Sequence, residues 1–338
     1  MNRRAFLTGC AGVALTGCRS KAVIEPAPPI RLYAAGRNPV AFLPVFAAHT
    51  AGLFAQAGVN VSFRDGGAEG DPAAALMAGQ ADVVAGLYED VLRAAAAGNA
   101  FTAFALATRS PLLAIVASPA ARVRNLEDLL KVRIALPEEQ SPEHVFLNYN
   151  YFQEGGEPVD LKTVVVGYGS PLANALIKKT AGAAVADSLT LRYILQDIPD
   201  LEIVADTRTL AGVIATYGVS SYPGAVLFTT RRWLQSFPHA AQRLRAALVR
   251  AGHWIRTRPA EQAAEAIPEE RRGADPAILA EAVHEAYPLF SQDGAIPADG
   301  AREALKAVEL ASEAVKKAHL DLKATYTNAF APLAEPRP

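Results

Sequence analysis

The feature that most constrains the fold of this 338-residue chain is a regular alternation of short apolar runs with helical segments. Between residues 30 and 205, apolar runs of four to eight residues recur, and the segments between them repeat their apolar positions with helical spacing. Strands that alternate with helices in this way form βαβ units with parallel strands. The pattern therefore predicts an α/β protein, and the length allows about two domains.

Turn and capping residues mark where the predicted elements begin and end. The predicted strands cover residues 30–35, 59–63, 81–87, 101–108, 112–117, 132–136, 163–166, 183–186, 201–205 and 225–229. Helices are predicted over residues 41–57, 72–79, 142–152 and 188–195, with further helices starting at residues 125 and 170. The chain after residue 229 is predicted to be mostly helical, over residues 233–256, 260–266, 277–290 and 298–318.

The composition excludes several classes of function. Lys and Arg number 33 against 34 Asp and Glu, so the chain lacks the basic face that a nucleic-acid partner needs. Cys10 and Cys18 are the only cysteines, so no disulfide or cysteine metal site can form beyond residue 18. The six histidines are dispersed, with no pair at helical spacing. The sequence therefore predicts no metal site and no cofactor.

The first residues have the pattern of an export signal. Arg3-Arg4 followed by an uncharged run of 13 residues resembles a twin-arginine signal, and the run is too short to span a membrane. Leu15-Thr16-Gly17-Cys18 resembles a bacterial lipoprotein box, which implies cleavage before Cys18 and lipidation of its thiol. This resemblance implies a signal peptide over residues 1–17, a lipid-anchored tether over 18–29 and a location in the periplasm. A buried N-terminal helix is the alternative.

A series of short motifs resembles a family of transport proteins. Pro44 leads to Gly52-Leu-Phe54, then to Gly58-Val-Asn-Val61, and then to Leu76-Met-Ala-Gly79-Gln80-Ala-Asp82-Val83. Their order and spacing resemble the extracytoplasmic solute-binding proteins of ABC importers, in the branch for nitrate, sulfonate, taurine and thiamine-pyrimidine compounds. The Gly and Asp positions suit helix ends and a tight turn, so the motifs bear on the fold more than on the ligand.

The resemblance implies a two-lobed fold of the type II periplasmic-binding-protein kind, with mixed sheets flanked by helices. Lobe one would hold residues 30–115 and 215–335, and lobe two residues 116–214. The chain would cross between the lobes near residues 110–117 and 205–222, and the C-terminal helices would brace lobe one. The lobes would close on a ligand about these two crossings.

The function that the resemblance implies is capture of a small solute and its delivery to an ABC permease and ATPase. The protein would be a monomer that reaches the membrane through its lipid anchor. A ligand-sensing lipoprotein that works with a membrane receptor is an alternative. An enzyme of the thiamine-pyrimidine type on the same fold is a weaker alternative, because its cysteine-rich motif is absent here. Tyr168-Gly169-Ser170-Pro171 also lacks the pattern of a nucleophile elbow.

The ligand cleft is predicted beyond the carboxyl ends of the strands, where open α/β sheets bind ligands. Loops that follow predicted strands there include residues 37–39, 66–67, 88–89, 109–110, 138–141, 168–170 and 187–188. The candidate ligand-binding residues in these loops are Asn38, Gly66, Gly67, Tyr88, Glu89, Arg109, Tyr168, Gly169, Ser170, Asp187 and Ser188.

Several of these residues have both a binding and a structural interpretation. Gly66-Gly67 can bring backbone N–H groups close to a ligand oxygen, or can form a simple turn. Ser170 and Asp187 can contact the ligand or cap a helix. Arg109 can clamp a carboxylate or sulfonate, or can form an ion pair at the hinge or surface.

Tyrosines and helix N-termini indicate the kind of ligand. Tyr88, Tyr168 and Tyr217 can stack on a ring, although a single tyrosine more often serves packing. Helix N-termini and Arg109 favour an anionic or strongly hydrogen-bonding group. The expected ligand is therefore a small organic solute, either a sulfonate-, nitrate- or taurine-like anion or a thiamine-pyrimidine-like compound.

Overall fold

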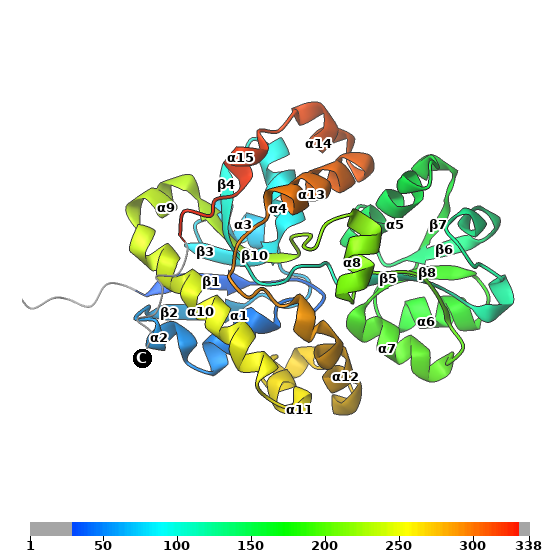
Figure 1. The fold of residues 1–338 in the computed structure, drawn as a ribbon, viewed down its shortest axis with the longest axis horizontal. Coiled ribbons are helices and arrows are strands. Elements are labelled where there is room, and N and C mark those ends of the chain that lie inside the picture. Colours follow the sequence, from blue (N-terminus) through cyan, green and yellow to red (C-terminus); the bar gives the residue numbers. More distant parts are fainter. Residues whose placement is uncertain (1–28, 331–338) are drawn as a thin grey trace, which may run out of the picture.

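Two five-stranded sheets organise residues 29–330, the part of the chain that the computed structural model describes (Figure 1). Each sheet forms the centre of one lobe, with helices on its faces. The predicted signal peptide, Cys18 and the predicted tether up to residue 28 lie outside the described residues. Within residues 29–330, no helix combines the length and the apolar character needed to cross a membrane.

The sheet of lobe one has the strand order β2-β1-β3-β10-β4. Strand β1 runs parallel to β2 and β3, whereas β10 is antiparallel to β3 and β4. The strands are β1 (Ile30–Ala34), β2 (Val61–Asp65), β3 (Val83–Leu87), β4 (Phe101–Leu106) and β10 (Ala225–Thr230).

The sheet of lobe two repeats this arrangement in the order β7-β6-β8-β5-β9. Strand β6 is parallel to β7 and β8, and β5 is antiparallel to β8 and β9. In both sheets the antiparallel strand enters directly from a segment that crosses between the lobes. The strands are β5 (Leu113–Ala117), β6 (Arg133–Leu136), β7 (Lys162–Val165), β8 (Ala183–Asp187) and β9 (Glu202–Asp206). The predicted α/β fold with mixed sheets is confirmed.

The helices follow the predicted pattern with identifiable exceptions. The predicted helix 41–57 is divided at Gly52, whose φ of 66° is left-handed, and helix 233–256 is divided before Pro238. Helices α4 and α8 were not predicted. Lobe one contains α1 (Leu43–Thr50), α2 (Leu53–Gln56), α3 (Pro72–Met77), α4 (Tyr88–Ala96), α9 (Arg231–Ser236), α10 (Pro238–Arg256) and α11 (Ala260–Ala264). Lobe two contains α5 (Pro142–Gln153), α6 (Ser170–Ile177) and α7 (Ser188–Asp197), and α8 (Leu210–Tyr217) lies in the second crossing.

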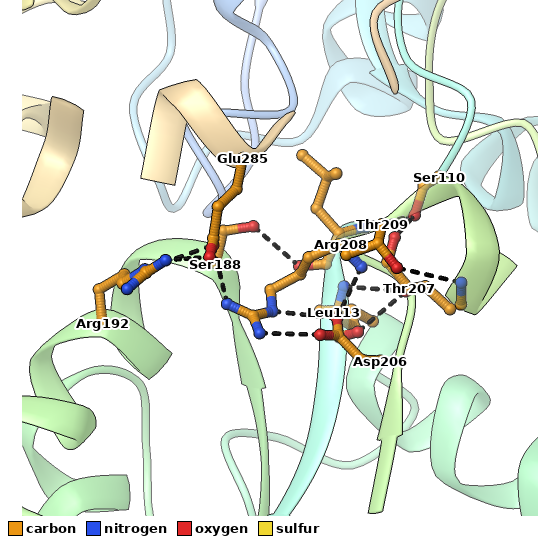
Figure 2. A network of polar contacts seen from close by, with 11 residues as sticks. Ser110, Leu113, Ser188, Arg192, Asp206, Thr207, Arg208, Thr209 and Glu285 are labelled. Atoms are coloured by element: carbon orange, nitrogen blue, oxygen red, sulfur yellow. Dashed lines mark hydrogen bonds and ion pairs between the residues drawn. The ribbon is translucent and has the colours of Figure 1, made fainter. Parts of the chain in front are cut away.

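The chain crosses between the lobes at residues 107–112 and 207–224, and the two crossings lie side by side (Figure 2). Ser110 Oγ donates to Thr207 O, and Leu113 N donates to Thr207 Oγ1 at 3.1 Å. Farther along, Tyr222 N donates to Arg109 O at 3.0 Å. Because β5 pairs entirely within the second sheet, lobe two begins at Leu113 and not at residue 116 as expected.

The sequence analysis expected the C-terminal helices to brace lobe one alone. In the structure they contact both lobes. Helix α13 (Ala298–Ala311) packs on α4 and also on α5, where Tyr149 Oη donates to Glu303 Oε2 at 2.7 Å. Helix α12 (Pro276–Ala286) packs on α7 of lobe two. The predicted helix 298–318 ends early because Ser312 starts a separate helix, α14 (Glu313–Ala318), as its N-cap. The last helix is α15 (Leu322–Thr325).

Candidate functional site

A cavity of about 570 Å³ lies between the two lobes and is lined from both of them. Its walls follow the carboxyl ends of β1, β3, β6 and β7, as the rule for open sheets predicts. The volume lies within the usual range of small-molecule sites, about 300–1,000 Å³. The polar side chains that line it are Arg37, Asn38, Glu69, Asp71, Asp90, Arg93, Asn99, Glu138, Glu139, Gln140, Ser141, Glu143 and Tyr168.

One face of helix α4 forms part of the lobe-one wall. Asp90, Arg93, Ala94 and Ala97 all line the cavity, and their spacing places them on a single side of the helix. Asp90 also fixes the start of the helix, because its carboxylate accepts from Leu87 N at 2.9 Å. The turn from β3 into α4 therefore determines which side chains face the cavity.

Arg37 connects the two walls. Its guanidinium forms two bonds to Glu69 of lobe one, Nη1 to Oε1 at 2.5 Å and Nη2 to Oε2 at 2.6 Å. The same group lies over the ring of Tyr168 of lobe two, 3.8 Å from the centroid, and Glu138 Oε2 lies 3.8 Å from Nη2. Arg37 thus holds the lobes together across the cavity by an ion pair and a cation–π contact.

Arg93 forms a second connection between the lobes. Within α4 it pairs with Glu89 at 3.2 Å and with Asp90 at 3.6 Å. It also donates to the backbone carbonyl of Gln140 in lobe two at 3.1 Å. Gln140 has a left-handed backbone, with φ of 58°. Arg93 therefore balances the buried carboxylate of Glu89 and the partly exposed carboxylate of Asp90, and at the same time contacts the opposite wall.

Arg271 supports the loop that carries Arg37. Arg271 Nη1 donates to Asp65 Oδ1 at 3.0 Å, and Nη2 of the same side chain donates to Gly36 O. Gly66 leaves room for the Tyr33 side chain, because a Cβ at this position would lie 1.9 Å from Tyr33 Oη and would displace it. These contacts fix the position of the residues 36–38 relative to the sheet.

Glu143 is a buried acid in the cavity lining. It lies in the first turn of α5, is only 5% exposed, and its Oε2 has no hydrogen-bond partner among residues 29–330. Burial, with the nearby charges of Asp187 and Glu89, raises the pKa of Glu143 to about 7. Burial also raises the pKa of the Glu89 and Asp187 carboxyls. The carboxyl of Glu143 in the cavity lining is thus poorly solvated, and so are those of Glu89 and Asp187, which act on it without lining the cavity.

Two of the predicted ligand residues, Asn38 and Tyr168, line the cavity. A third, Glu89, lies directly behind it, where it accepts from Tyr222 Oη at 3.0 Å and pairs with Arg93. Gly169 is the N-cap of α6 and Ser170 begins that helix with an exposed side chain, and neither lines the cavity.

The glycine pair at 66–67 supports the site without lining it. Gly67 O accepts a hydrogen bond from Gly36 N at 3.1 Å. Gly67 N donates to Asp65 Oδ1 at 2.9 Å, so this N–H group already has a partner within the chain. The structural interpretation of this turn is therefore the one that the geometry favours. The residues that reach the cavity are the next ones along the chain, from Ala68 to Ala73.

Three other predicted residues lie in structural positions away from the cavity. Tyr88 is fully buried and hydrogen-bonds to Thr325 at 2.6 Å. Asp187 caps α7, accepting from the backbone N–H groups of residues 189 and 190, each at 2.9 Å. Ser188 Oγ donates to Leu112 O at 3.3 Å. None of these three residues lines the cavity, and each has a hydrogen-bond partner within the chain.

The expected anion clamp at Arg109 also lies elsewhere. Arg109 is on the first crossing, where its Nη2 donates to Ser220 O at 2.7 Å. It lines a separate depression of about 240 Å³ beside residues 291–293. Tyr217, another candidate for ring stacking, is buried and stacks on Tyr222 at a centroid distance of 4.1 Å. Arg37 and Arg93 are the cations of the cavity instead.

The sequence analysis missed the contribution of α4 and of Glu143. The signal for α4 was present: Asp90, Arg93, Ala94 and Ala97 are spaced as one face of a helix. Glu143 carried no such signal, because an acid in the first turn of a helix ordinarily stabilises that turn. Its significance depends on its burial in the folded protein, which one sequence does not reveal.

Solved structures share the fold of this chain. A protein from Bordetella bronchiseptica RB50 is 29% identical, with a TM-score of 0.73 over 89% of this chain and 95% of that one. The alkanesulfonate-binding protein SsuA from Xanthomonas axonopodis, bound to MOPS, is 16% identical, with a TM-score of 0.64 over 89% and 98%.

A third structure is the zinc-bound ligand-binding component of an ABC-type import system from Staphylococcus aureus. It is 13% identical, with a TM-score of 0.64 over 89% of this chain and 97% of that one. These similarities establish the type II periplasmic-binding-protein fold that the sequence analysis predicted. No curated protein sequence matches the chain. The NMT1/THI5-like family matches residues 40–262, and the chain belongs to that family.

Proposed function

We propose that this protein is the solute-binding component of an ABC importer and captures a small organic solute between its lobes. The observation that carries this proposal is the cavity between the lobes, whose polar lining comes from both sides. A site built in this way is complete only when the lobes are close together. Bound solute therefore favours the closed form, which a membrane permease can distinguish from the open one.

The names of two proteins with the same fold support this role. One is named as an alkanesulfonate-binding protein and another as the ligand-binding component of an ABC-type import system. We propose a binding role and not an enzymatic one, with an ABC permease and its ATPase as partners. We further propose that the protein is a monomer in the periplasm, exported by the twin-arginine route and anchored through a lipid on Cys18.

Closure depends on the contacts that already join the walls. Arg37 lies between Glu69 and Tyr168, and Arg93 lies between Glu89 and Gln140. A solute that enters the cavity can add contacts to both walls, and its binding free energy shifts the equilibrium toward the closed form. The paired crossings at residues 107–112 and 207–224 provide the hinge.

A thermal-shift screen of the purified protein against a solute library tests the proposal. A solute at 100 times its dissociation constant adds about 2.7 kcal/mol of stability, which raises Tm by roughly 5 °C. Ala97→Trp fills the cavity and should abolish the shift, whereas Ala100→Trp, an exposed position that does not line the cavity, should preserve it. A solute that stabilises both variants equally would show that the cavity is not the binding site.

A further inference from the structure

The wall of the cavity carries far more acids than bases. Its charged side chains are two guanidinium groups, Arg37 and Arg93, and six carboxylates, Glu69, Asp71, Asp90, Glu138, Glu139 and Glu143. Such a lining produces a negative potential, which low-dielectric walls strengthen. An anion that enters the cavity would be repelled by most of the groups around it.

Both guanidinium groups already have acidic partners. Arg37 donates two hydrogen bonds to Glu69, at 2.5 and 2.6 Å, and stacks on Tyr168. Arg93 pairs with Glu89 and Asp90 and donates to Gln140 O. An anionic solute would have to compete with these carboxylates for the same N–H groups. The cavity therefore offers little to a sulfonate or to nitrate.

Two buried polar atoms of the lining have no partner within the described chain, Glu143 Oε2 and Asn38 Nδ2. The side chain of Glu143 is only 5% exposed. The amide of Asn38 is oriented by its Oδ1, which accepts from Val40 N at 3.1 Å, so its NH₂ group is the one left without a partner. A buried polar group without a partner is costly, and a ligand that satisfies it is favoured accordingly.

The surroundings of Glu143 match a positive partner. The charged groups that act on it are Asp187 at the end of β8 and Glu89 from α4, and a side-chain hydrogen bond from Ser141 offsets part of their effect. None of these is a cation, and the two carboxylates together with burial raise the pKa of Glu143 to about 7. A cation next to this carboxyl would reverse the effect and stabilise its ionised form.

A metal ion is not the cation that the geometry favours. Across residues 29–330, no three or more His, Cys, Asp or Glu side chains are grouped so that they could hold a metal. The cavity of about 570 Å³ is also much larger than a metal site needs. Its apolar part, which includes Phe42 and Leu87, suits the hydrocarbon portion of an organic molecule.

We infer that the solute is a small organic cation, a protonated amine or an amidinium, which donates an N–H to Glu143 Oε2 and accepts a hydrogen bond from Asn38 Nδ2. This inference rests on the proposed function and narrows its solute class. One molecule can contact both side chains, since Asn38 and Glu143 line the same cavity.

Three matched panels of probes test the inference by thermal shift and calorimetry. The cationic panel holds benzamidine, histamine and agmatine, the neutral panel benzamide and nicotinamide, and the anionic panel benzenesulfonate, butanesulfonate and nitrate. We expect stabilisation by members of the cationic panel. Glu143→Gln should weaken that binding about tenfold to a hundredfold, because a charge-assisted hydrogen bond is lost. Glu154→Gln, an exposed position at the end of the same helix, should leave the affinity unchanged.

Calorimetry in two buffers of different ionisation enthalpy gives an independent readout. A cation that ionises Glu143 releases a fraction of a proton at pH 7, and Glu143→Gln should abolish this release. Binding of the anionic panel that survives in Glu143→Gln would overturn the inference while leaving the proposed function intact. The absence of any shift across the three panels would count against both.

Discussion

Arg208 Nη1 donates to Glu285 Oε2 at 2.9 Å, and this ion pair ties the second crossing between the lobes to helix α12 (Figure 2). Arg208 is 5% exposed and also bonds Asp206 through Nε and Nη2, at 3.0 and 2.8 Å. Arg192 of α7 reaches the same Glu285 carboxylate. One carboxylate of a C-terminal helix therefore joins two elements on the lobe-two side of the hinge.

We expect Glu285→Gln to destabilise the protein, because Arg192 and Arg208 then share a neutral amide. Charge-assisted hydrogen bonds contribute about 1.5–3 kcal/mol, and partial exposure of Glu285 reduces the expected loss in unfolding free energy to about 1 kcal/mol. Glu281→Gln removes the more exposed partner of Arg192 and is the control. Exposed ion pairs contribute about 0.2–1 kcal/mol, so this change should alter the unfolding free energy less than Glu285→Gln does. Equal urea midpoints for both variants would contradict the assignment of Glu285 to the hinge.

Arg271 is predicted to act as a positioning residue for the loop that carries Arg37. Replacing Arg271 with Ala removes its donors to Asp65 and Gly36, so the backbone amides of residues 36–38 should exchange their hydrogens faster. Arg272→Ala removes donors that bond only residues 265 and 267 and provides the control. Unchanged exchange of residues 36–38 in the Arg271 variant, measured by mass spectrometry, would argue against this support.

The contact of Arg37 with Tyr168 should favour the closed arrangement of the lobes. Tyr168→Ala removes the ring beneath the guanidinium, a cation–π contact of about 0.5–2 kcal/mol, and should increase the radius of gyration of the unliganded protein. Tyr168→Phe keeps the ring and loses only a 3.4 Å contact to Glu138, so it should scatter X-rays like the wild type. Identical radii for all three proteins would show that this contact does not hold the lobes together.

Much of the fold could be predicted because local signals agree with the tertiary structure. All ten predicted strands exist, each shifted by at most two residues at its ends, since apolar runs between turn residues mark buried strands clearly. The predicted ends of helices differ from the structure where a residue inside the predicted range ends the helix. Gly52 adopts φ of 66° and Pro238 begins a new helix, so at both positions one residue outweighs the helical periodicity of its neighbours.

The site was predicted at the level of loops and not of side chains. The rule for open sheets pointed to residues 37–39, 138–141 and 168–170, and Arg37, Asn38, Glu138 and Tyr168 from those loops line the cavity. Tyr88 and Arg109 do not line the cavity, because Tyr88 bonds to Thr325 in the core and Arg109 donates to Ser220 O in the crossing. Those partners are distant in the chain, and a sequence pattern does not contain them.

The N-terminal anchor is tested by Cys18→Ser. If residues 1–17 are a signal peptide and Cys18 is lipidated, this change should abolish palmitate labelling and release or stall the precursor. Cys10→Ser is the matched control and should label normally, because Leu7-Thr8-Gly9-Cys10 leaves almost no apolar segment before the cut. Undiminished labelling of the Cys18 variant would rule out the proposed anchor.

The stability of the protein should depend on pH through Glu143. The folded state raises the pKa of this carboxyl from an ordinary 4.5 to about 7, so it holds the proton more tightly than the unfolded chain does. Stability is therefore greatest below pH 4.5 for this group, falls as pH rises toward 7, and stays reduced above it, by on the order of 3 kcal/mol. Glu143→Gln lacks the titrating group, so the wild type should lose stability relative to this variant between pH 5 and pH 8. Urea unfolding at several pH values measures the difference, and Glu154→Gln should follow the wild type. Parallel pH curves for the wild type and Glu143→Gln would mean that the carboxyl is solvated in the folded protein, which would also remove the unpartnered acceptor on which the cationic ligand depends.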